Sequence, residues 1–282
     1  MQTSLERVLH QARGENRAAL IGYIPAGFPT VEGCKRAIDV LIDSGFDAVE
    51  IGYPYSDPVM DGPIIQEAAD QALRNGVKAK DVLGTLHHAT ERGAAAVVMT
   101  YWNPIEQFGV DKFAHAIAQA GGSGVITPDL SFEQAQPWNQ SAARAGINTI
   151  YVVAPSTTDD RLRKVTGITS GFIYAASLMG VTGTRTSVSN SAQELVARIR
   201  QVSDLPVAVG LGVSTPEQAR EVATYADGVI IGSALIKELL GKDLDKGLVG
   251  LEELALSLAA ATRSANRESP GVSGAKEARG VK

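Results

Sequence analysis

Two carboxylates, eleven positions apart, are the first residues in this sequence that could do acid–base chemistry. Glu50 lies within the largely apolar segment 47–51, which has the composition of a buried β-strand. Asp61 lies at the end of the loop that follows, which is rich in proline and glycine. Because burial penalises an ionised carboxylate, we expect Glu50 to have a raised pKa and to exchange protons near neutral pH. The alternative is that Glu50 is paired with another side chain or faces solvent.

The elements that would carry these carboxylates alternate regularly along the chain. The predicted strands cover residues 18–23, 47–51, 95–100, 124–127, 149–153, 171–175, 206–210 and 228–231. The predicted helices cover residues 31–44, 64–74, 80–92, 111–120, 132–145, 158–166, 192–202 and 216–224, and helical pattern continues to about residue 263. The strands are continuous apolar runs, which is typical of parallel strands covered on both faces.

Eight strands, each followed by a helical segment, predict an α/β fold, a (β/α)8 TIM barrel, with a doubly wound open sheet as the alternative. An extra N-terminal helix is expected over residues 2–13, where apolar residues fall on one face. We expect one domain over residues 1–263. The remaining tail, 264–282, is rich in serine, glycine and charge, so we expect it to be disordered.

The composition restricts the setting and the partners. The chain has 282 residues, of which 44% are hydrophobic, so it can bury a sizeable core. The net charge is −5 and no basic block occurs, so nucleic acid is not an expected partner. No apolar run is long enough for a membrane span, and residues 1–20 do not resemble a signal peptide. The single cysteine, Cys34, excludes an internal disulfide and favours the cytoplasm.

The active site of a (β/α)8 barrel lies at the C-terminal ends of its strands. The residues expected there include Tyr23, Glu50, Tyr101, Asp129 and Tyr174. No lysine or histidine ends a predicted strand, so neither a Schiff-base mechanism nor a histidine metal centre is expected. Carboxylates and tyrosines remain as the acid–base groups, and we predict no metal and no cofactor.

Glycines after the last two predicted strands suggest a phosphate site. Gly210-Leu211-Gly212 follows one of these strands, and Gly232-Ser233 follows the other and opens a helix. Backbone N–H groups there would bind an anion without a basic side chain. Each motif alone also fits a simple turn. The polar segment 180–186 could close over the site as a lid, or be an ordinary loop.

Five segments occur together in one order: 25–29 (Pro-Ala-Gly-Phe-Pro), 50–63 with its Ser-Asp-Pro and Asp-Gly-Pro, 101–104 (Tyr-Trp-Asn-Pro), 180–183 (Gly-Val-Thr-Gly), and the two glycine motifs. In this order, over about residues 18–236, the chain resembles the tryptophan synthase alpha subunit family. The resemblance implies a (β/α)8 barrel that cleaves indole-3-glycerol phosphate to indole and glyceraldehyde 3-phosphate in tryptophan biosynthesis. It also implies a tryptophan synthase beta subunit as partner, in an α2β2 complex, that receives indole through a tunnel.

The resemblance also assigns roles to residues. The catalytic pair falls on Glu50 and Asp61. The expected substrate-binding residues are Tyr23, Met99, Tyr101, Asp129, Tyr174 and Thr182, and the expected phosphate-binding residues are Gly183, Gly212, Val213, Gly232 and Ser233. The expected partner contacts are Pro54, Ser56, Asp57 and Pro58. The chain departs from the family pattern at Tyr55 and Leu211, where phenylalanine is common, and at Ser131, where proline is usual.

The family's reaction agrees with these acid–base groups. Protonation of the indole ring at C3 creates an electron sink, and a base must then take the proton of the glycerol hydroxyl. Neither step requires a lysine or a metal. We expect Glu50 to move these protons and Asp61 to accept the indole N–H and stabilise its developing charge.

Two other classes of function remain as alternatives to this reading. A sugar-phosphate isomerase or epimerase would share the glycine motifs but would not need the 54–63 loop. A barrel that only binds and activates a partner would use that loop but would not need an acid at Glu50. Indole release from the chain, with and without its partner, distinguishes these cases, and efficient release without a partner would indicate a stand-alone indole lyase.

Overall fold

The structure is a computed structural model and describes residues 2–176, 185–210 and 212–267. The strands within these ranges are β1 Ala19–Pro25, β2 Ala48–Gly52, β3 Ala95–Met99, β4 Gly124–Ile126, β5 Asn148–Ile150, β6 Val152–Val153, β7 Ile173–Ala176, β8 Val207–Gly210 and β9 Gly228–Ile231. The helices are α1 Ser4–Gly14, α2 Val31–Asp43, α3 Pro63–Arg74, α4 Ala79–Glu91, α5 Trp102–Phe108, α6 Val110–Gln119, α7 Gln136–Ala145, α8 Asp159–Thr166, α9 Arg185–Arg200, α10 Pro216–Tyr225, α11 Ser233–Leu239 and α12 Leu244–Arg263.

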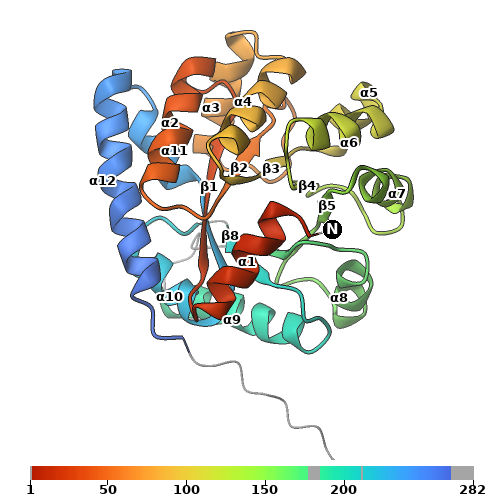
Figure 1. Cartoon of the computed structure of the whole chain (residues 1–282). Coiled ribbons are helices and arrows are strands. Elements are labelled where there is room, and N and C mark those ends of the chain that lie inside the picture. The colour runs from red at the N-terminus through yellow and green to blue at the C-terminus, as the bar shows by residue number, and fades with distance from the viewer. Residues whose placement is uncertain (1, 177–184, 211, 268–282) are drawn as a thin grey trace, which may run out of the picture.

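The strands form one parallel sheet in the order β5-β4-β3-β2-β1-β9-β8-β7-β6. Because β5 and β6 are consecutive in the chain and stand at the two ends of this order, the sheet closes into a barrel. The helices form a ring around the strands (Figure 1). The predicted (β/α)8 barrel is therefore confirmed.

Strand β2 lies between β1 and β3, and all five of its residues are buried. In the register of the sheet, Glu50 is aligned with Tyr23 of β1 and with Val97 of β3. Apart from Glu50, the strand consists of Ala, Val, Ile and Gly, which suit a sheet covered on both faces. The fold thus places one carboxylate inside the apolar wall of the barrel.

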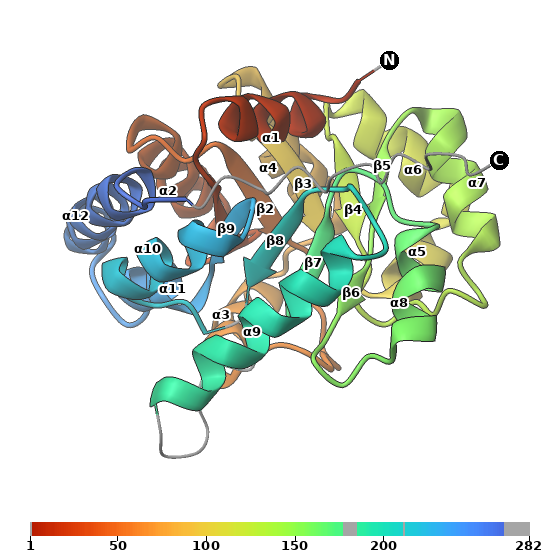
Figure 2. The same ribbon diagram turned by 90° about the horizontal axis from the view of Figure 1, so that it is seen from below.

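Helix α1 covers the end of the barrel at which the strands begin (Figure 2). It starts with a capping box, in which the Thr3 side chain accepts from the N–H of Glu6 and the Glu6 carboxylate accepts from the N–H of Thr3. Its apolar face buries Leu5, Leu9 and Ala12. The extra N-terminal helix that the sequence predicts is therefore present, and it leaves the opposite end of the barrel open for chemistry.

Several observed elements differ from the predicted ones. The fifth predicted strand, 149–153, divides at Tyr151 because β5 pairs with β4 whereas β6 pairs with β7. Strand β1 continues to Pro25, which is aligned with Gly52. Helix α7 starts later than predicted, with Pro137 in its first turn. Helix α5 is not among the predicted helices, because it has only seven residues and a proline, Pro104, in its first turn.

Within the described ranges, no helix is long and apolar enough to cross a membrane. The tail predicted to be disordered is 264–282. Its first four residues, 264–267, are described, and residues 268–282 lie outside the described ranges.

The last of these residues is fastened to the barrel by a buried ion pair. Asp227, directly before β9, is 4% exposed and accepts bonds from Arg13 at 3.1 Å and Arg267 at 3.0 Å. It also accepts the backbone N–H of Val207, and Arg200 lies 3.5 Å away. Burial acts to raise the pKa of Asp227, but the bond from Arg13, the bond from Val207 and the arginine charges outweigh it and lower that pKa. The charge cluster thus joins α1 and Arg267 to the start of β9.

We expect Arg267→Ala to lower the free energy of unfolding by about 1–3 kcal/mol, because Asp227 and the backbone oxygen of Arg17 each lose a charged donor. Urea denaturation at neutral pH measures the change. Arg263→Ala is the control, since Arg263 is exposed and a surface substitution of this kind changes stability by about 0.5 kcal/mol or less. Equal stability of both variants would show that the ion pair does not fasten the segment.

Candidate active site

Glu50 is buried inside the barrel, and one of its carboxyl oxygens has no hydrogen-bond partner in the described structure. Its side chain is 1% exposed, and the oxygen without a partner is Oε2. Burial, followed by the nearby carboxylate of Asp61, raises the pKa of Glu50 to about 8. The two alternatives, an ion-paired or an exposed glutamate, do not agree with this environment. A carboxyl group with this pKa is largely protonated at neutral pH and can act as a general acid.

Asp61 is held by a tyrosine that follows the next strand. The Tyr101 hydroxyl donates to Oδ1 of Asp61 at 3.1 Å and accepts the backbone N–H of Met60 at 3.2 Å. Burial raises the pKa of Asp61, and the bond from Tyr101 offsets part of that shift. Asp61 is partly exposed, whereas Tyr101 is buried. A single hydroxyl group thus fixes two consecutive residues of the loop and orients the carboxylate.

Two further tyrosines lie close enough to interact electrostatically with both carboxylates. Tyr23 of β1 and Tyr174 of β7 are both buried. Burial, and then the negative charges of Asp61 and Glu50, raise the pKa of both hydroxyls well above their ordinary value. Both tyrosines are therefore neutral at physiological pH, and they can offer hydroxyl groups and apolar ring faces to a substrate.

Two glycines at strand ends make room for these tyrosines. A Cβ atom at Gly52 would overlap the Tyr23 hydroxyl, and a Cβ atom at Gly210 would overlap the Tyr174 hydroxyl. Sequence analysis placed Gly210 in the phosphate motif and assigned no role to Gly52. The signal that identifies them is a glycine at the end of a strand otherwise made of buried apolar residues.

Met99 ends β3 beside Gly52 and is 8% exposed. It therefore lies in the same wall of the barrel as Glu50, two residues before Tyr101. Its flexible thioether suits contact with a flat aromatic ring. The structure thus brings together five of the predicted residues at one end of the barrel: Glu50, Asp61, Tyr23, Met99 and Tyr101, with Tyr174 close to both carboxylates.

Four of the five predicted phosphate residues follow β8 and β9. Gly212 has a φ of +94°, a conformation that suits glycine, and Val213 beside it is buried. Gly232 is the N-cap of α11 and Ser233 is its first residue, and no side chain among the described residues caps this helix. Its first N–H groups are therefore uncapped by protein side chains. Thr182 and Gly183 lie outside the described residues.

The remaining predicted residues are Asp129 and the four expected partner contacts. Asp129 is exposed, and both of its carboxylate oxygens accept the backbone N–H of Trp102 at 3.0 Å. Pro54 is buried within the described chain. Ser56 and Asp57 are exposed. Pro58 is partly exposed, and Val59, which was not singled out, is 72% exposed.

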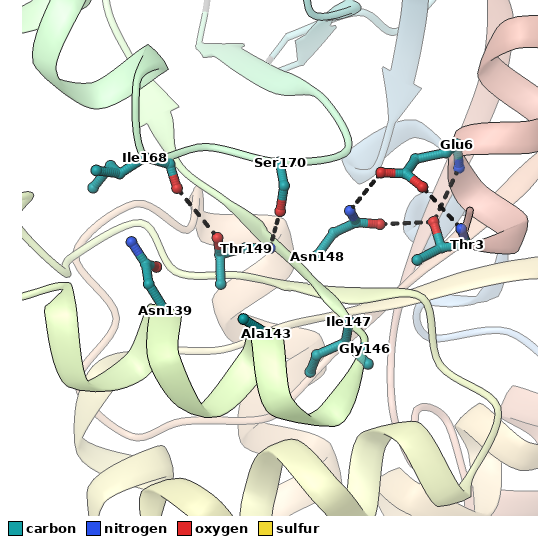
Figure 3. Close-up of a pocket in the computed structure, with 10 residues that line it drawn as sticks. All are labelled: Thr3, Glu6, Asn139, Ala143, Gly146, Ile147, Asn148, Thr149, Ile168 and Ser170. Atoms are coloured by element: carbon teal, nitrogen blue, oxygen red, sulfur yellow. Dashed lines mark hydrogen bonds between the residues drawn. The ribbon is translucent and has the colours of Figure 1, made fainter. Parts of the chain in front are cut away.

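A cavity of about 420 Å³ lies at the opposite end of the barrel, beside α1 (Figure 3). Its polar groups bind one another: Thr3 donates to Asn148 at 2.7 Å, and Asn148 donates to Glu6 at 3.0 Å. Thr149 donates its hydroxyl to the backbone oxygen of Ile168 and its N–H to the Ser170 hydroxyl. The bonds of Asn148 with Thr3 and Glu6 fasten α1 to the start of β5. The cavity is therefore a structural junction.

Among the described residues, no three histidine, cysteine or acidic side chains lie close enough to hold a metal ion. The C-terminal ends of the strands instead carry the buried carboxyl of Glu50, the carboxylate of Asp61 and neutral tyrosines. A parallel (β/α)8 barrel with this set at the C-terminal ends of its strands belongs to the class of acid–base barrel enzymes.

Comparison with known proteins identifies the family. The profile of the tryptophan synthase alpha chain family matches residues 9–263. The tryptophan synthase alpha chain of Thermobifida fusca is 52% identical over 269 residues, covering 94% of this chain and 100% of that protein. The chain belongs to the tryptophan synthase alpha chain family and is a lyase of tryptophan biosynthesis.

Solved structures agree with this assignment. A structure of Mycobacterium tuberculosis tryptophan synthase has a TM-score of 0.86 and 48% identity, covering 93% of this chain and 99% of that chain. The tryptophan synthase alpha subunit of Legionella pneumophila is 31% identical with a TM-score of 0.84, covering 93% and 99% of the two chains. The family resemblance found in the sequence is thus confirmed.

We expect Gly52→Ala to destabilise the protein by about 1–3 kcal/mol, because the added methyl group would displace the Tyr23 ring. Thermal unfolding measures the loss. Gly84→Ala in α4 is the matched control: no atom lies within 4 Å of its added Cβ, and alanine is favoured in a helix. A Gly52→Ala protein as stable as the wild type would contradict this packing.

Proposed function

We propose that Glu50 and Asp61 are the acid–base pair with which this chain cleaves indole-3-glycerol phosphate to indole and glyceraldehyde 3-phosphate. Membership of the family establishes the reaction class, and the two carboxylates supply groups suited to it. The observation that carries the proposal is the burial of Glu50, whose pKa is raised to about 8. Such a carboxyl is available as an acid at neutral pH and as a base after it has lost its proton.

The proposed reaction begins with proton transfer from Glu50 to C3 of the indole ring. The ring becomes an indolenine cation, and Asp61 stabilises its charge by accepting the N–H. Glu50, now ionised, takes the proton of the glycerol hydroxyl next to the breaking bond. The hydroxyl carbon becomes the aldehyde of glyceraldehyde 3-phosphate, and the electron pair of the carbon–carbon bond returns to the ring to give indole. Glu50 ends the cycle protonated.

The remaining residues would hold the substrate in place. Tyr23, Met99 and Tyr174 offer ring faces and a thioether to the indole, in a part of the barrel where water is largely excluded. Backbone N–H groups at Gly212, Val213, Gly232 and Ser233 would bind the phosphate. Thr182 and Gly183 are assigned to substrate and phosphate by family resemblance.

Family membership implies a tryptophan synthase beta subunit as partner. The finer proposal is an α2β2 complex in the cytoplasm, in which the loop after β2 contacts the partner. The exposed side chains of this loop are Ser56, Asp57 and Val59, with Pro58 partly exposed. Val59 is an apolar residue exposed to 72%, which suits a surface that is covered on binding.

We expect Glu50→Gln to bind the substrate normally and to lose at least about 100-fold in kcat, because glutamine is isosteric but cannot transfer a proton. The measurement is indole release at saturating substrate, with the beta subunit present. Glu67→Gln, on the exposed face of α3, is the control and should retain full activity. Near-normal turnover of the Glu50 variant would overturn its assignment.

We expect Asp61→Asn to lose at least about tenfold in kcat, because the amide cannot balance the positive charge that develops on the indole nitrogen. The same assay measures this, and Asp70→Asn on α3 serves as the exposed control. If the variant lost affinity for the substrate but retained kcat, Asp61 would be a binding residue with no part in charge stabilisation.

A further inference from the structure

Asp61 depends on a neighbour for its orientation. It lies in a loop with few buried side chains, and the described hydrogen bond to its carboxylate comes from the Tyr101 hydroxyl. The same hydroxyl accepts the N–H of Met60, so Tyr101 fixes both the carboxylate and the backbone that carries it. Any movement of the Tyr101 ring would therefore move Asp61.

The Tyr101 ring is itself supported by Tyr55, from the same loop as Asp61. The two ring centroids are 5.3 Å apart and the planes are inclined by 33°. The Tyr55 hydroxyl accepts a hydrogen bond from the side-chain amide of Asn103 at 3.2 Å. Tyr55 is one of the positions at which this chain departs from the family pattern. The hydroxyl that a phenylalanine would lack makes this contact with α5.

Helix α5 provides a fixed base for the contact. Asn103 lies in its first turn, and the carboxylate of Asp129 holds the N–H of Trp102, the first residue of the helix. A carboxylate at a helix N-terminus stabilises that end of the helix. The contacts thus run without a gap from Asp129 through α5 to Asn103, then through the two tyrosine rings to Asp61.

We propose that Tyr55 is a positioning residue for Asp61, held in place by Asn103 and acting through the ring and hydroxyl of Tyr101. The inference rests on the proposed role of Asp61. It also gives Asp129 a task in the site other than substrate contact: it anchors the helix on which Asn103 lies. Tyr55 and Asn103 are not themselves expected to touch the substrate.

The test uses Tyr55→Phe and Asn103→Ala in the full chain, assayed with saturating beta subunit. Each variant should lower kcat for indole release by about two- to tenfold, the equivalent of one neutral hydrogen bond, with KM unchanged. Because both remove the same contact, the double variant should lose no more than either single variant. Tyr53→Phe, two residues earlier in the same loop and partly buried, is the matched control and should leave kcat unchanged.

Two further measurements separate positioning from other roles. In an Asp61→Asn background, Tyr55→Phe should have no additional effect on kcat. Titration with the beta subunit should give the same midpoint for wild type and Tyr55→Phe, and a weaker midpoint with unchanged kcat at saturation would make Tyr55 an interface residue instead. If Asp61→Asn is inactive but Tyr55→Phe and Asn103→Ala have wild-type kcat, the positioning inference fails alone. If Asp61→Asn is fully active, the proposed function of Asp61 fails first.

Discussion

Dehydration of the Glu50 carboxyl is the constraint on which the site depends. An ionised carboxylate in the middle of a fully buried strand is costly, and no cation in the described structure compensates for it. The group therefore retains its proton to a pH near its raised pKa of about 8. The barrel tolerates this residue because β2 is paired on both sides and a large apolar core surrounds it.

The surroundings of Glu50 follow from the same requirement. A positively charged partner would lower the pKa of Glu50, and the described neighbours are instead a second carboxylate and neutral tyrosines. The tyrosines fit inside the barrel because Gly52 and Gly210 have no side chains that would overlap their hydroxyl groups. Asp61 enters from a loop and is oriented by Tyr101, so it can be tuned by contacts outside the barrel. In the proposed function, Glu50 in the strand transfers protons, and Asp61 in the loop stabilises the charge on the indole nitrogen.

Much of this could be predicted from the sequence. The apolar runs separated by helical segments were sufficient for the barrel, and a single Glu50 within such a run was sufficient to expect a raised pKa. The split at Tyr151 could not be predicted, because it depends on which strands pair at the closure of the barrel. Helix α5 was missed because its first turn contains a proline and its length is short.

The site was less predictable where side chains depend on tertiary packing. Nothing in the linear order shows that Tyr55 lies on Tyr101, or that Asn103 reaches back to it. Pro54 was assigned to the partner surface by family resemblance, and its burial after β2 could not be predicted from the sequence. Asp129 was assigned to substrate by family resemblance, and its bond to the Trp102 N–H appears only once α5 is formed. Arg267 lies in a segment of low apolar content, and its bonds to the buried Asp227 and to the backbone oxygen of Arg17 explain its position.

The most direct test of the account is the titration of the Glu50 carboxyl itself. Carbon-13 NMR of the protein labelled at glutamate side-chain carboxyls, with Glu50→Gln used to assign the resonance, gives its midpoint in the absence of substrate. The account predicts a midpoint near 8, because the carboxyl is buried and its Oε2 has no hydrogen-bond partner in the described structure. A midpoint near 4.5, the ordinary value for glutamate, would mean that Glu50 is ionised at neutral pH, and it would contradict the role of Glu50 as the general acid.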